Sequence, residues 1–268
     1  MIKRGHLARA FPTMLRVGLA EMVAYRSELV IWILTASAPV IMLLVWDGVA
    51  AGGSIKGYDQ PAFARYFTAG LVVRQLTSAW VVWELNHEIR TGALSPALLK
   101  PMHPLVLRAA ENLVAIPFRI LVLIPLVAAL WLWRPEMGMP LTLEGALLLP
   151  LSLALGWAMN FLVQVAFGAV AFWVDQSLGL FNVWFALWAL LSGYLFPLSL
   201  LPGPLAQIAI LLPFRSMLAT PTEIAAGQLT GPAALQALAL QTFWTLVFFA
   251  IARATWNRGV RHYEAFGA

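Results

Sequence analysis

The sequence predicts an all-α integral membrane protein with six transmembrane helices in a single domain, 1–268. Of its residues, 61% are hydrophobic and only 11% are charged, and the mean hydropathy is +0.82. A soluble domain of this size could not bury so much apolar surface. Six stretches contain the ~20 mostly apolar residues that a helix needs to cross the bilayer. They are too long for barrel strands and lack period-two alternation. The expected spans are Leu29–Val49, Phe63–Trp83, Val114–Trp133, Ala146–Val174, Leu178–Phe196 and Ala233–Ile251.

The first 28 residues predict an amphipathic helix that lies in the cytoplasmic membrane interface. One helical face collects Leu7, Phe11, Met14, Leu15, Met22 and Tyr25. Arg9 and Arg16 fall opposite Leu7. The basic residues also interrupt the apolar run that a signal peptide would need. An unstructured basic tail is the alternative.

The lysines and arginines of the connecting segments predict that both termini are cytoplasmic, because cytoplasmic loops carry an excess of these residues. With the N-terminus inside, the inside segments hold Lys3, Arg4, Arg9, Arg16, Arg26, Arg90, Lys100, Arg108, Arg253, Arg258 and Arg261. The outside segments hold Lys56, Arg65, Arg134 and Arg215. Orientation therefore accounts for the net charge of +5, and we expect no nucleic-acid partner.

The segment Trp83–Leu105 is a polar island between two apolar stretches, and the charge bias places it in the cytoplasm. Residues 84–91 have helix-forming character, and Gly92 is expected to end that helix. Ser95 and Pro96 are expected to begin a second short helix as its N-cap and first residue. That helix would end before Lys100 and the proline after it.

The second of these short helices has an apolar side formed by Leu94, Leu98 and Leu99. A segment that only connects two spans does not need leucine-bearing helices. The pattern therefore favours a folded insert that contacts something outside the membrane. An ordinary solvated loop is the alternative.

A proline-rich segment, 197–232, lies between the fifth and sixth expected spans. Its apolar stretch Leu205–Leu212 is too short to cross a bilayer. We expect this stretch to form a short helix that enters from outside and returns. Irregular backbone at that depth must be buried in protein or line a cavity.

Several polar side chains are expected at membrane depth. Arg74 lies near the centre of the second span, and Asn160 and Gln164 near the middle of the fourth, where they could be its partners. A charge at this depth is costly unless it is paired or hydrated. These three residues are candidates for a hydrated translocation pathway. Hydrogen bonding between helices is the alternative, left open for Arg74 and favoured for Gln164.

Motifs of several enzyme classes are absent from the sequence. No Lys follows a Gly, which excludes a G-x-x-x-x-G-K-[ST] phosphate loop, so the chain is not expected to hydrolyse ATP by itself. There is no H-E-x-x-H and no G-x-S-x-G. The four His are far apart in sequence, and there is no Cys. We therefore expect no catalytic residue and no metal site in this chain.

Two stretches resemble the permease subunits of ABC transporters, in the type-2 exporter class. The first is the insert, ELNHEIRTGALSPALLKPMHPL, which resembles the cytoplasmic loop after the second span in that family. The second is SGYLFPLSLLPGPLAQIAILLPF, which resembles the end of span five and the re-entrant external segment. With the six spans and the interfacial helix, the resemblance covers essentially the whole chain.

The resemblance implies a multi-pass subunit of an ATP-driven exporter in the bacterial cytoplasmic (inner) membrane. Two permease subunits would pair within membrane lipid, each above an ATP-binding cassette subunit that holds ATP and Mg, while this chain binds no cofactor. A hydrophobic or amphiphilic substrate is expected. The loop 84–105 would be the coupling helix, and its expected contacts with the ATPase subunit are Glu84, His87, Glu88, Ile89, Arg90, Leu94, Leu98, Leu99 and Lys100.

Two other classes of protein remain as alternatives. A secondary transporter is expected to carry acidic residues near the midplane for ion coupling, and no Asp or Glu is central in any expected span. A membrane-embedded enzyme needs a cluster of His, Asp or Glu at catalytic spacing. Glu84, His87 and Glu88 form the only dense cluster, and they lie beside apolar packing residues.

Overall fold

The structure is a computed structural model that describes residues 26–175 and 177–263. Apart from one isolated bridge between Ile55 and Tyr58, its regular structure in these ranges is helical. The predicted interfacial helix over residues 1–28 lies almost entirely outside the described part of the chain. Only its last three residues fall within it, and they belong to the first described helix.

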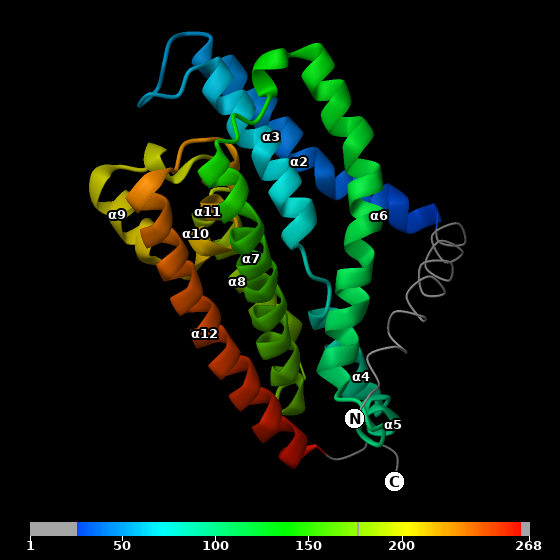
Figure 1. Cartoon of the computed structure of the whole chain (residues 1–268). Coiled ribbons are helices and arrows are strands. Elements are labelled where there is room, and N and C mark those ends of the chain that lie inside the picture. The colour runs from blue at the N-terminus through cyan, green and yellow to red at the C-terminus, as the bar shows by residue number, and fades with distance from the viewer. Residues whose placement is uncertain (1–25, 176, 264–268) are drawn as a thin grey trace.

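In the described part of the chain, six long helices form the body of the molecule (Figure 1). They are α2 (Arg26–Ala50), α3 (Gln60–Thr77), α6 (Pro104–Trp133), α7 (Leu143–Ala169), α8 (Ser177–Leu191) and α12 (Gly231–His262). Short helices connect them: α4 (Val82–Thr91), α5 (Leu94–Leu98), η1 (Pro135–Met137), η2 (Val170–Phe172), η3 (Leu198–Leu200), α9 (Gly203–Leu211), α10 (Pro213–Met217) and α11 (Ala219–Ala225).

Among the described residues, three helical segments are long and apolar enough to cross a membrane: Pro104–Trp133, Leu143–Phe172 and Gly231–His262. Shorter apolar helices lie at Ala38–Ala50 and Ser177–Leu191. At 1.5 Å per residue, a helix of 15 residues such as α8 measures about 22 Å, less than the ~30 Å hydrocarbon core. The chain is therefore an all-helical, multi-pass membrane protein, and the six-span arrangement stays a prediction.

The two ends of the bundle are formed by different helices and connections (Figure 1). One end holds α4, α5, the start of α6 and the end of α12, and is called the insert end below. The opposite end, called the far end, holds the α2–α3 and α6–α7 connections. There Arg134 is ion-paired with Asp47 at 2.7 Å and with Glu136 at 2.7 Å. A backbone hydrogen bond and the Arg134 side chain lower the pKa of Glu136, so this carboxylate stays charged near neutral pH.

One stripe along α7 organises the packing of the bundle. Ser152, Gly156, Asn160, Gln164 and Gly168 recur every four residues and are all buried. Residues at this spacing lie on one helix face. A Cβ built on Gly168 would come within 2.9 Å of the Leu85 side chain, so the glycine allows α4 to approach α7 closely. The stripe thus brings the insert against the bundle.

The proline-rich segment 197–232 folds into short helices. The stretch Leu205–Leu212 corresponds largely to α9, where Leu205, Ile208 and Leu211 are exposed. Nearly all side chains of the following helices α10 and α11 are covered. An apolar surface such as that of α9 also suits the outside of a membrane bundle, so the re-entrant path of this segment stays a prediction.

The buried side chain of Gln241, on α12, is hydrogen-bonded to both α7 and α10. Its Nε2 donates to the carbonyl oxygens of Ser152, at 2.9 Å, and Ser216, at 2.8 Å. Its Oε1 accepts a hydrogen bond from the Ser152 hydroxyl at 2.9 Å. The side chain is 0% exposed, so none of these groups has water as a substitute.

Gln241→Ala should therefore destabilise the folded protein by roughly 1–3 kcal/mol for each buried group left unpaired. Thermal unfolding of the purified protein in detergent measures the loss. Gln236→Ala is the matched control, because Gln236 lies on the same helix and is exposed. Equal unfolding temperatures for the two variants would contradict this role for Gln241.

Candidate functional site

The predicted second span, Phe63–Trp83, is not one helix. α3 ends at Thr77 and α4 begins at Val82, and extended backbone at Ser78 marks the end of α3. We call residues 78–81 the break. No Pro or Gly lies in it, so the sequence carries no local signal for a helix end. Side chains from α6 and α7 hold the break instead, and this tertiary effect is why the prediction of a continuous span was wrong.

Gln164 of α7 is the main partner of the break. Its Oε1 accepts a hydrogen bond from the backbone N–H of Val81 at 2.8 Å, and its Nε2 donates to the Ala79 carbonyl at 2.7 Å. From α6, the Asn112 side-chain oxygen accepts from the N–H of Trp80 at 2.9 Å. These contacts replace the hydrogen bonds that a continuous helix would have made.

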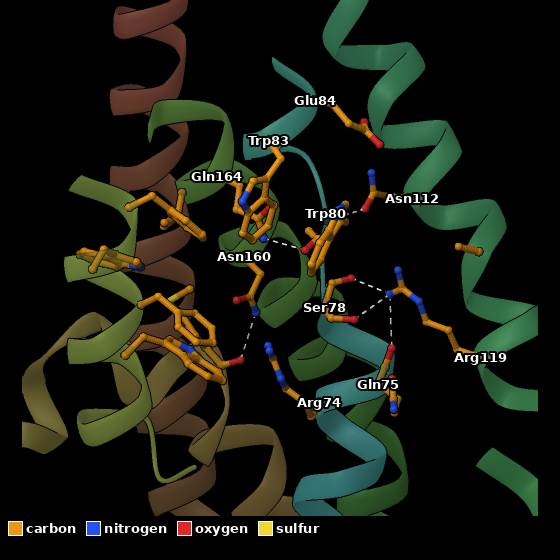
Figure 2. A pocket seen from close by; sticks show the side chains of 18 of the residues that line it. Arg74, Gln75, Ser78, Trp80, Trp83, Glu84, Asn112, Arg119, Asn160 and Gln164 are labelled. Carbon is orange, nitrogen blue, oxygen red and sulfur yellow. Dashed lines mark hydrogen bonds between the residues drawn. The ribbon is translucent and has the colours of Figure 1, made fainter. Parts of the chain in front are cut away.

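Arg119 of α6 completes the support of the break (Figure 2). Its guanidinium donates to the Ser78 carbonyl at 2.7 Å and to the Ser78 hydroxyl at 2.8 Å. A longer contact of 3.4 Å reaches the Gln75 carbonyl. The positive charge of Arg119 therefore interacts with backbone oxygens at the end of α3.

Beside the break lies a cavity of about 640 Å³, between α3, α4, α6, α7 and α8. Arg74, Asn160 and Gln164, the three residues predicted for a translocation pathway, all line it. Its polar lining also includes Gln75, Ser78, Glu84, Glu111, Asn112, Arg119 and Asn182. The lining also contains six aromatic side chains, called the aromatic wall below: Trp80, Trp83, Phe181, Trp184, Phe185 and Trp188.

Arg74 does not pair with Asn160 or Gln164 as the sequence suggested. Its guanidinium lies over the ring of Trp188, 4.5 Å from the ring centre, and near Tyr194 at 5.6 Å. The Asn160 side chain donates to the carbonyl oxygens of Gly156, at 2.9 Å, and Met217, at 3.4 Å. Figure 2 shows Arg74 reaching from α3 into the cavity.

At the insert end of the cavity, Arg108 of α6 binds three carboxylates. It pairs with Glu88 and with Glu84 of α4, the latter at 3.2 Å, and with Glu111 of its own helix at 2.8 Å. Glu84 and Glu111 also line the cavity. The ion-paired cluster therefore connects the insert directly to the lining of the cavity.

Within the insert, the helix expected over residues 84–91 is present as α4, and Gly92 ends it with a left-handed φ of 80°. The second helix, α5, begins at Leu94, earlier than predicted. Ser95 is therefore not its N-cap, and its hydroxyl lies 3.3 Å from the Tyr263 hydroxyl.

The nine residues predicted to touch an ATPase subunit fall into two groups. Ile89 is 2% exposed and Leu94 is 0% exposed, because both pack against α7 and α12 in the chain's own core. Glu84 and Glu88 are held by Arg108, and Leu98 is half-buried. The exposed members are His87, Arg90, Leu99 and Lys100, with Leu99 88% exposed. Arg90 also donates to the Asp175 carbonyl at 2.9 Å.

The sequence analysis missed most of the polar lining, although two signals were available. On α6, Arg108, Asn112 and Arg119 recur at helical spacing and define one polar stripe. On α7, the four-residue repeat described above contains Asn160 and Gln164. The aromatic wall carried no such signal, because aromatic residues are common on any membrane helix.

These features define a class: a multi-pass membrane protein with a polar and aromatic cavity in its bundle and a folded insert at one end. In the described ranges, no group of three or more His, Asp or Glu is placed to hold a metal ion. The family model described as "ABC-2 family transporter protein" matches residues 30–267. The chain therefore belongs to this family, and it is a permease component of an ABC transporter. A search of curated proteins and a search of solved structures each found no match.

The hydrogen bonds of the break make Gln164 testable. Gln164→Ala leaves the Val81 N–H and the Ala79 carbonyl without this partner, at a cost of roughly 1–3 kcal/mol per buried group. We expect a lower unfolding temperature together with faster amide hydrogen exchange at residues 78–82.

Gln207→Ala on the exposed face of α9 serves as the control and should change neither quantity. Unchanged hydrogen exchange at the break in Gln164→Ala would show that other groups hold it.

Proposed function

We propose that this chain is the transmembrane subunit of an ATP-driven exporter of hydrophobic or amphiphilic substrates. In this proposal the cavity is part of the translocation pathway, and ATP is hydrolysed by a separate ATP-binding subunit. The single observation that carries the proposal is the joining of insert and cavity through the break and the Arg108 cluster. A change in the position of the insert would change the shape of the cavity directly.

The insert is proposed as the coupling helix. Its buried side, with Ile89 and Leu94, fixes it to α7 and α12. Its exposed side, with His87, Leu99 and Lys100, is the surface offered to the ATP-binding subunit. An exposed leucine at the insert end, flanked by charged residues, suits a protein partner better than water.

The break is proposed as the joint of the mechanism. α4 is not continuous with α3, so it can tilt without bending a helix across the bilayer. Hydrogen bonds from side chains are directional but individually modest, at roughly 0.5–1.5 kcal/mol each. They can exchange during a transition that a continuous helix would resist.

The sides of the bundle are proposed to meet lipid and a second permease subunit. Exposed apolar side chains are frequent on α6 and α8, and include Leu121, Ile124, Leu132, Val183 and Leu187. The insert end is proposed to be cytoplasmic, with both termini on that side. The described Lys and Arg support this, since Arg90, Lys100, Arg108, Arg258 and Arg261 belong to that end.

Charge reversal at Lys100 tests the coupling surface. Lys100→Glu should weaken co-purification of the ATP-binding subunit by roughly tenfold. The new carboxylate would be repelled by an acidic partner of Lys100, or would be left unpaired in the contact. Unfolding temperature should not change, since Lys100 is exposed.

Arg258→Glu makes the same reversal at an exposed position near the end of α12, outside the insert. It should retain the ATP-binding subunit. If Lys100→Glu and Arg258→Glu assemble equally well, the insert is not the coupling surface.

A further inference from the structure

We propose that the cavity binds an amphiphile with an anionic head group, and that Arg74 is the residue that binds the anion. The aromatic wall would cover the apolar part of the same molecule. This inference rests on the proposed function, because it names the substrate class of the cavity that we assign to the translocation pathway. A carboxylate and a phosphate share the required chemistry.

Arg74 brings a positive charge to the cavity without an ion-pair partner among the described residues. Among the described residues, the ion pairs are formed by Arg108, Arg134 and Arg215, and none involves Arg74. A charge in a membrane bundle is costly unless it is paired or hydrated. Arg74 is half-buried and lines the cavity, so an anion inside the cavity can reach it.

Aromatic rings hold the Arg74 guanidinium in place. Its guanidinium lies over the rings of Trp188, Tyr194 and Phe185, at 4.5, 5.6 and 6.0 Å from the ring centres. Contacts with ring faces are worth roughly 0.5–2 kcal/mol and fix the plane of the cation. A guanidinium has five N–H donors in its plane, which match two oxygens of one carboxylate or phosphate. Stacking thus fixes the plane of the guanidinium, and its hydrogen bond with the Tyr194 side chain leaves other donors for an anion.

Charge is unevenly distributed along the cavity. Glu84 and Glu111 lie at its insert end, where Arg108 binds both. Arg119 adds a second cation to the lining beside the break. The part of the cavity away from the insert is therefore positive, and a low dielectric strengthens its attraction for an anion.

The size and lining of the cavity suit a molecule with a polar and an apolar part. Its volume of about 640 Å³ falls within the range of about 300–1,000 Å³ that is usual for small-molecule sites. Trp184, Phe185 and Trp188 lie on α8, whereas the polar stripes lie on α6 and α7. A small fully polar anion would leave these rings uncovered, whereas an amphiphile with one apolar part would use both surfaces.

Binding can be measured with the full-length protein in nanodiscs of zwitterionic lipid, with no ATP and no partner present. The probe is stearic acid that carries a nitroxide, which quenches tryptophan fluorescence, and four tryptophans line the cavity. The methyl ester of the same probe is the neutral control for partition into lipid. We expect a saturable quenching component with the acid that is at least about tenfold weaker with the ester.

Variants of two arginines on α3 complete the test. Arg74→Gln should abolish the saturable component, and Arg74→Lys should restore most of it, since the positive charge returns. Arg65→Gln, on the same helix but away from the cavity lining, should bind as the unchanged protein does. Each variant is first shown to be monodisperse, and Arg74→Lys keeps the test valid if Arg74→Gln fails to fold.

Equal binding of the acid and the ester would overturn the proposal, and so would wild-type binding by Arg74→Gln. Because no ATP-binding subunit is present, this result is independent of the coupling surface. Loss of assembly without loss of anion binding would instead count against the proposed function alone.

Discussion

The arrangement depends on how the backbone is satisfied where α3 ends inside the bundle. An unpaired N–H or C=O in hydrocarbon costs several kcal/mol, so a helix can stop at this depth only where other groups replace its hydrogen bonds. Gln164, Asn112 and Arg119 supply them from two neighbouring helices. The same three side chains would lose their partners if α3 and α4 joined into one helix. The break and its supporting residues therefore stabilise each other.

Both the cavity and the position of the insert follow from this break. Ending α3 at Thr77 leaves space that Arg74, Asn160 and the α8 aromatics line. Because α4 starts at Val82, the insert lies next to the cavity. There Gly168 permits close packing of α4 on α7, and Arg108 binds the α4 carboxylates. Membership of the ABC-2 family gives this geometry its context, since permeases of this family imply association with an ATP-binding subunit.

Sequence reasoning succeeded where a local pattern determines the structure. Composition predicted a helical membrane protein, helix-forming residues followed by Gly92 predicted α4 and its end, and two motifs predicted the family. It failed where distant residues decide. The break contains no Pro or Gly, so only the positions of Gln164 and Arg119 in space reveal it. Likewise, Ile89 and Leu94 have the composition of a contact surface, and only the fold shows that they face inward.

The central claim is that ATP acts on the cavity through the insert and the break. The chain has no cysteine, so Ala115→Cys on the α6 side of the cavity introduces a unique thiol in this subunit. We measure how fast this thiol reacts with a small water-soluble thiol reagent in the complete reconstituted complex, with and without ATP. Ala51→Cys at the far end is the control. The account predicts that ATP changes the rate severalfold at position 115 and leaves it unchanged at position 51. Equal rates at position 115 with and without ATP would contradict it.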